Sequence, residues 1–242
     1  MARSFQIVFL LAFSAIFFLT TFFSTIFVST TFVFSILFPT LAEAQTDPPA
    51  VVTFTLDFPT STPEHYSLRI PSRGSAHYES SGRVSEDSDE TDNFDLDFAL
   101  GAETRQKIFA LAAKAGYFQK DIASPHKGVA FTGKKTLSYK DERRSGECTY
   151  NYSTIPAVQD LTSLLQSLSI TLEFGHRLQY DLHYQKLALD EELKRMEEMA
   201  HHDELTEVTA IQPILDQIIA DPSVMNVTRA RAQRLLEHAG AR

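Results

Sequence analysis

Alternation of hydrophobic and polar residues predicts several strands after residue 50. Val52, Phe54, Leu56 and Phe58 are separated by polar residues, which is the period of a strand with one buried face. The same alternation predicts strands at 66–70, 75–80, 93–98, 135–140 and 148–152. Turn-forming residues at Pro71–Gly74 join the second strand to the third, so we expect a hairpin there.

One helix is predicted between these strands. Residues 103–115 place Ile108 and Leu111 on one face, and Gly116 is a suitable C-terminal cap. Four strands, a helix and two further strands are typical of an antiparallel sheet with helices on one face. We therefore predict an α+β domain over residues 51–175, built on an antiparallel β-meander sheet with helices packed on one face.

The remainder of the chain is predicted to be helical. Leucines recur at helical spacing from Pro156 onward, and the only strong helix breaker in the next forty residues is Gly175. The pattern allows one helix over 156–199 or two helices that meet in a bend near Gly175. Two shorter helical patterns follow, at 208–219 and 226–240. We expect a long C-terminal helix and, over 176–242, a helical C-terminal extension that either covers the sheet or projects from it.

The start of the chain has the composition of a segment that enters a membrane. Residues 4–42 contain no ionisable side chain and hold 11 of the 19 phenylalanines. Ala42-Glu43-Ala44 then matches the small-x-small site that a signal peptidase cleaves. Because the apolar stretch is unusually long, two interpretations stand: a cleaved signal peptide over 1–44, or a retained membrane anchor. Both place the remainder, after a proline-rich linker at 45–50, in the periplasm or outside the cell.

Charge and cysteine content narrow the class of partner. The formal net charge is −9, and the leader does not alter it because it holds one basic and one acidic residue. Such a chain lacks the basic face that nucleic acids and anionic lipids require, so we expect no nucleic-acid partner and membrane contact only through an uncleaved leader. Cys148 is the only cysteine, which predicts a buried strand thiol or a bridge between two copies.

One group of residues has the spacing of metal ligands. Glu197, Glu198, His201 and His202 pair twice as carboxylate and imidazole four residues apart, so each pair shares a helix face. Such pairs can chelate Zn²⁺, Ni²⁺ or Cu²⁺. The same spacing also describes a solvated helix end at which histidine complements the helix dipole. These four residues are the metal candidates of the chain, and no cofactor is predicted.

Three other patterns resemble functional motifs but lack required parts. Glu173 and His176 have the spacing of a di-metal helix, yet no second such pair occurs, so we expect them to form a polar, aromatic seam with His183 against the sheet or a partner. Residues 128–135 lack the hydroxyl and the following helix of a phosphate-binding loop. The acidic segment 86–92 lacks the glycine and terminal glutamate of a calcium loop. No catalytic residue is assigned.

Two hairpin segments carry a resemblance to a known family. Tyr66–Ile70, a glycine turn and Ala76–Glu79 resemble a family of bacterial exported domains of unknown function. Its members share a β-meander and a helix similar to Ile108–Leu111. The tail at 220–231 is similar to the tails of uncharacterised envelope proteins. The resemblance covers residues 51–175 and implies an α+β fold without implying an activity.

The leading functional hypothesis is a non-enzymatic exported protein that binds a partner protein or self-associates through its C-terminal helices, as coiled coils do. It depends on an apolar stripe that continues past the point where a small sheet would cover it. The stripe consists of Leu178, Leu182, Leu189, Leu193 and Met196. One alternative is a metal-dependent protein or hydrolase that uses histidines of the long helix. Another is an inhibitor-like module that inserts the turn at 71–74 or 143–146 into a cleft.

Overall fold

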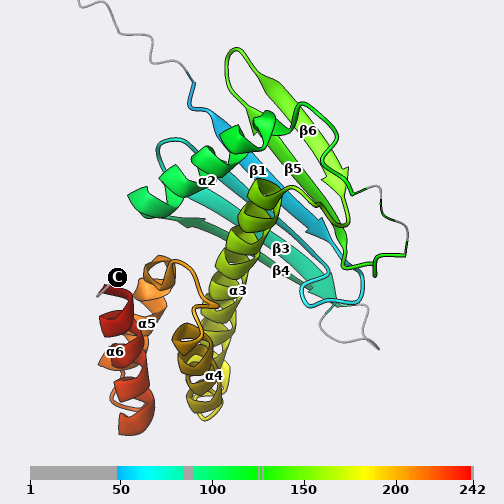
Figure 1. Cartoon of the computed structure of the whole chain (residues 1–242). Helices are drawn as coiled ribbons and strands as arrows, with labels where there is room; N and C mark the ends of the chain where they lie inside the picture. Colours follow the sequence, from blue (N-terminus) through cyan, green and yellow to red (C-terminus); the bar gives the residue numbers. More distant parts are fainter. Residues whose placement is uncertain (1–47, 84–89, 125, 127, 241–242) are drawn as a thin grey trace, which may run out of the picture. The chain divides into compact units, whose positions relative to one another are not determined.

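A six-stranded antiparallel sheet begins the described part of the chain (Figure 1). The structure is a computed structural model that describes residues 48–83, 90–124, 126 and 128–240. The predicted leader lies outside these residues, as do parts of the linker and of the acidic segment. The strands are β1 (Val51–Asp57), β2 (His65–Pro71), β3 (Ala76–Arg83), β4 (Thr91–Phe98), β5 (Lys134–Lys140) and β6 (Ser145–Tyr150). They lie in the order β4-β3-β2-β1-β5-β6.

The helices follow the order that the sequence predicts. They are α2 (Ala102–Lys114), α3 (Pro156–Tyr184), α4 (Leu189–His201), α5 (Gln212–Ala220) and α6 (Asn226–Gly240). There are also two short 3₁₀ turns. The first, η1 (Gly116–Phe118), precedes the loop that leads to β5, and the second, η2 (Val208–Ile211), precedes helix α5. Among the described residues, no helix combines the length and the apolar character needed to cross a membrane.

One face of the sheet is apolar and forms the core. In β1, Val52, Phe54 and Leu56 are buried, and the register places Phe54 between Leu68 of β2 and Leu137 of β5. Helices α2 and α3 cover this face (Figure 1). Because apolar residues two apart share a face, the alternating pattern alone determines which side of each strand is buried. The predicted α+β class, with helices packed on one face of an antiparallel sheet, is confirmed.

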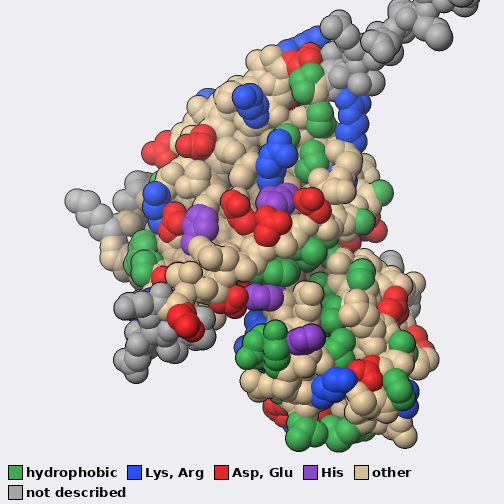
Figure 2. Space-filling view, turned by 180° about the vertical axis from the view of Figure 1, so that it is seen from behind, with side chains coloured by type: hydrophobic (Ala, Val, Ile, Leu, Met, Phe, Trp, Pro, Cys, Tyr) green, Lys and Arg blue, Asp and Glu red, His purple; other side chains and the backbone are tan. Residues whose placement is uncertain are grey.

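The opposite face of the sheet is polar. His65 and Asp57 pair across β2 and β1 with 2.6 Å between Nδ1 and Oδ1. On β3, His77 lies between Asp95 and Asp97 of β4, at 3.2 and 2.9 Å. Figure 2, which views the molecule from behind, shows histidine and acidic side chains gathered on this side. Cross-strand pairing of opposite charges is the expected way for a solvated sheet face to carry acidic residues.

Helix α3 runs through Gly175 without a break, so neither predicted form of the long helix is right. It ends at Tyr184, and a new helix, α4, begins at Leu189. A Cβ atom at Gly175 would approach Ile211 to 2.6 Å, so the glycine allows η2 to pack closely against the helix. The chain turns instead at Gln185, whose N–H bonds the carbonyl of Asp181. No glycine or proline marks that turn.

Helix α4, the turn η2 and helix α5 pack on α3, and α6 packs on α4 and α5. They cover the apolar stripe of α3 and α4: Leu178, Leu189, Leu193 and Met196 are fully buried, and Leu182 is half-buried. The expectation that this stripe lies uncovered is therefore wrong. The predicted boundary between residues 175 and 176 falls inside α3, and the described residues belong to one compact unit that spans Asp47–Arg242.

Strand β6 begins and ends earlier than the alternation predicts. It ends at Tyr150, and Tyr152 is 42% exposed beyond its end. Cys148 is only half-buried, and its thiol lies 2.9 Å from the carbonyl oxygen of Lys120 and 3.4 Å from that of Phe118. The turn η1 thus lies against the edge of β6 and partly covers the thiol.

Candidate functional site

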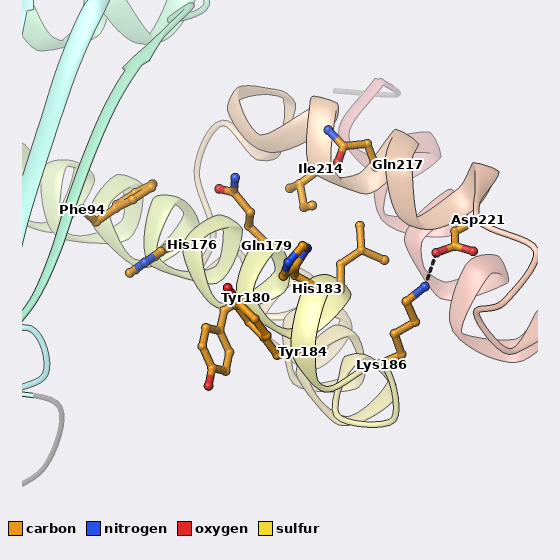
Figure 3. A pocket seen from close by; sticks show the side chains of 11 residues that line it. Phe94, His176, Gln179, Tyr180, His183, Tyr184, Lys186, Ile214, Gln217 and Asp221 are labelled. Atoms are coloured by element: carbon orange, nitrogen blue, oxygen red, sulfur yellow. Dashed lines mark hydrogen bonds and ion pairs between the residues drawn. The ribbon is translucent and has the colours of Figure 1, made fainter.

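A groove of about 710 Å³ lies beside the C-terminal half of α3 (Figure 3). Its walls come from three elements that are distant in sequence: Phe94 of β4, the last three turns of α3, and α5 with the residue that follows it. The side chains that α3 contributes to the groove include His176, Gln179, Tyr180, His183 and Tyr184. Opposite them lie Ile214, Gln217 and Asp221. The lining combines aromatic rings with amide and imidazole groups.

Two exposed tyrosines form the outer wall of this groove. Tyr180 is 51% exposed and Tyr184 is 68% exposed, and their ring centres are 4.9 Å apart. The ring of His183 stands edge-on to Tyr184, with 4.4 Å between centres. Helical spacing explains the arrangement, because residues 180 and 184 are one turn apart and share a face. Large rings held side by side on a rigid helix offer contact area at little entropic cost.

The inner end of the groove is anchored to the sheet by Glu173. Its Oε1 atom accepts hydrogen bonds from the hydroxyls of Tyr78 and Ser80, each at 2.7 Å. Burial opposes ionisation of Glu173, but the nearby His176 and these two hydroxyls outweigh it and lower the pKa of the carboxyl. The same burial, together with the charge of Glu173, raises the pKa of Tyr78. The carboxylate therefore holds α3 to β3.

His176 joins this anchor to the groove. Its ring stacks on Phe94 with 4.2 Å between centres and an interplanar angle of 8°. Its Nδ1 atom lies 4.0 Å from Glu173, and its Nε2 atom lies 3.6 Å from Asp92. The predicted polar, aromatic seam is confirmed for Glu173 and His176, which contact the sheet. His183 lies two turns further on and faces the groove.

The charged groups at the outer end of the groove are balanced within the chain. Lys186 donates to Asp221 at 2.6 Å and to Ser223 at 2.6 Å. The hydrogen bond from Lys186, followed by those that the hydroxyl and the N–H of Ser223 donate to Asp221, lowers the pKa of Asp221. The aromatic rings and the amide groups of Gln179 and Gln217 that line the groove are suited to stacking and hydrogen bonding with a ligand.

The four metal candidates lie at the end of α4, away from this groove. Glu197 forms ion pairs with Arg231 and with Arg234 of α6, whereas Glu198, His201 and His202 are exposed. Within the described ranges, no three histidine, cysteine or acidic side chains are placed to hold one ion. The metal site stays a prediction, and the structure gives Glu197 a role in joining two helices.

Sequence reasoning missed most of the groove. It singled out His176 and His183 but not Tyr184, Gln217 or Asp221, because α5 reaches α3 only through the turn at residues 185–188. It also missed His238, whose ring centre lies 6.0 Å from that of His201. The spacing of Tyr180 and Tyr184 was the one available signal for the outer wall.

Comparison with known proteins does not assign the chain to a family. No protein-family model matches the sequence, and no curated protein matches it. The resemblance to bacterial exported domains stays a prediction. The function must therefore be argued from the site itself.

Proposed function

We propose that this chain is an exported, non-enzymatic binding protein that holds a polypeptide partner against the outer wall of the α3 groove. The observation that carries the proposal is the pair of exposed rings at Tyr180 and Tyr184. Export is supported by the uncharged stretch at 4–42 and by the cleavage pattern that ends at Ala44. The resemblance to exported bacterial domains agrees with this placement.

Tyrosine is enriched where proteins meet because it combines a large apolar ring with a polar tip. Leu187, three residues beyond the end of α3, is 80% exposed and adds apolar surface to the turn that follows the helix. Gln179 and Gln217 offer amide donors and acceptors that can satisfy the backbone of a bound peptide. Because Tyr180 and Tyr184 leave the outer wall of the groove exposed, one segment of a partner can lie across it.

Charge indicates which kind of partner is favoured. The chain carries a net charge of −9, so two copies repel each other. Beside the groove, Asp92 of the edge strand β4 lies 3.6 Å from His176, and its side chain is 59% exposed. We therefore favour a different protein that presents an apolar or aromatic segment flanked by basic residues, rather than a second copy of this chain.

Site-specific photo-crosslinking in cells that express the full chain tests this proposal. A benzophenone amino acid at position 184 should give a discrete adduct, and Tyr180→Ala should reduce its yield at least fivefold. The same probe at Tyr152, which is 42% exposed on another surface, is the matched control and should give no such adduct.

Light scattering of the purified protein separates the alternatives. A monomer, together with an adduct only at position 184, supports a different partner. An adduct with the mass of two copies would show self-association instead. Identical adducts from positions 184 and 152, or none from either, would overturn the proposal.

A further inference from the structure

A second cavity, of about 330 Å³, lies at the other end of α3 and is independent of the groove. It is enclosed by the start of β5, the end of β6 with the segment that leads to α3, and the first turns of α3 itself. Apart from one lysine, its lining side chains are neutral hydroxyls, amides and tyrosines. That single cation, Lys135, is hydrogen-bonded within the fold but has no negative partner among the described residues.

Lys135 is only 5% exposed, although it carries a charge. Its Nζ atom donates to the carbonyl oxygen and the hydroxyl of Thr132, at 3.0 and 2.9 Å, and to the carbonyl oxygen of Asn151 at 3.0 Å. All three acceptors are neutral. In the described part of the chain, no carboxylate lies within ion-pair distance of it.

A buried ammonium without a negative partner is costly, and folded proteins seldom keep one without a reason. Burial lowers the pKa of Lys135, which expresses the same cost. The contrast with the rest of the molecule is sharp: in a chain with a net charge of −9, this cavity holds one positive charge and no carboxylate side chain. An anion in the cavity would supply the missing charge.

We propose that this cavity binds a small hydroxylated carboxylate of the sugar-acid class, with Lys135 supplying the positive charge. One cation matches one carboxylate, and the surrounding hydroxyls and amides match the hydroxyls of such a ligand. Thr132 links the two parts of the site. Because its oxygen accepts from Lys135, its hydroxyl proton is directed away from the ammonium, and it makes only a long bond of 3.3 Å to Asn151.

The first turns of α3 add neutral polar groups to the cavity. The helix begins at Pro156, and Gln159 and Ser163, one turn apart, line the cavity. Their amide and hydroxyl groups can hydrogen-bond the hydroxyls of a bound ligand. The volume of the cavity is at the lower end of the range for small-molecule sites, which agrees with a ligand of one sugar ring.

Calorimetric titration tests the proposal. The full chain is expressed, and the protein is purified in the form that the cells produce, whether or not they remove the leader. D-glucuronate should bind saturably, and D-glucose, which lacks the carboxylate, should bind at least tenfold more weakly. Lys135→Met should weaken glucuronate binding at least tenfold, because it removes the positive charge, and the thermal unfolding temperature measured alongside shows whether the variant is folded. Lys134→Met is the matched control: Lys134 is the exposed neighbour on β5, and its replacement should leave both measurements unchanged.

Each other outcome overturns the proposal. Equal binding of glucose and glucuronate would remove the charge preference, and unchanged binding by Lys135→Met would remove the role of the lysine. Tighter binding of inorganic phosphate than of glucuronate would assign the cavity to a different anion. A destabilised Lys135→Met variant, in a protein that binds neither glucuronate nor acetate, would show that the lysine only ties the segments at 132 and 151 together.

Discussion

The two ends of helix α3 handle charge in different ways. In its C-terminal half, Glu173 is half-buried beside His176 and two hydroxyls, and just past its end Lys186 is paired with Asp221. At its N-terminal end, Lys135 is buried against neutral oxygens alone. Balanced charges join one element to another, whereas an unbalanced one leaves a demand that a ligand can meet. The comparison predicts which substitutions destabilise the fold and which change only binding.

The largest effect on the free energy of unfolding is expected at a core residue in the middle of α3. Leu172 is fully buried in α3, so Leu172→Ala should lower the free energy of unfolding by about 2–5 kcal/mol through lost burial and the cavity left behind. Denaturant unfolding followed by circular dichroism measures it. Ile170→Ala, at a position 38% exposed on the same helix, should cost less than about 1 kcal/mol. Equal losses in both variants would contradict the placement of α3.

The next effect concerns the balanced charge at Glu173. Glu173→Gln should cost about 1–3 kcal/mol at neutral pH, because charged acceptors bind the hydroxyls of Tyr78 and Ser80 more strongly. Since the pKa of Glu173 is lowered by folding, its contribution is complete above the ordinary value of 4.5 and is lost as the pH falls through the folded value. Unfolding curves at pH 7 and pH 3 should therefore differ less in the variant than in the wild type.

A smaller effect is expected where ion pairs join α4 to α6. Arg231 pairs with Asp190 and Glu197, and Glu197 keeps a second partner in Arg234. Arg231→Met should therefore lower stability by about 1 kcal/mol, with the loss shrinking at high salt. Thermal unfolding in low and high salt measures this. A loss that is independent of salt would assign the effect to packing of the arginine stem.

The smallest effect on stability is expected at the exposed rings. Tyr184→Ala should change the free energy of unfolding by less than about 0.5 kcal/mol, because its ring is mostly solvated. With the benzophenone probe moved to position 180, the same variant should give less of the crosslinked partner proposed for the groove. A large loss of stability would show instead that the ring supports the packing of α3.

The strands could be located from sequence because their signal is local. Alternation at Val52, Phe54 and Leu56 reports burial directly, and the order of elements then favours one class of fold. The end of α3 could not be located, because Tyr184 and Gln185 carry no helix-breaking signal. The helix ends there because Leu189 and Leu193 are buried when the chain folds back, and that burial involves residues far away in sequence.

The same distinction applies to the two candidate sites. The exposed pair at Tyr180 and Tyr184 follows from helical spacing, but the wall opposite them comes from α5. Lys135 belongs to a segment, residues 128–135, that resembles a phosphate-binding loop without matching it. Nothing in that segment shows that Lys135 is buried without a counter-charge. A phosphate-binding loop is followed by a helix, whereas strand β5 stands here, so the motif was correctly excluded from the sequence. The sequence pattern could not reveal the cavity that Lys135 shares with α3.

By itself, the sequence determined the strand pattern, the α+β class, the acidic balance and the predicted export signal, because each depends on neighbouring residues or on composition. Tertiary structure decided where α3 stops, which leucines are covered, and which charges find partners. Those outcomes depend on contacts between segments far apart in the chain. Burial and charge balance are properties of surroundings, and only the folded chain creates them.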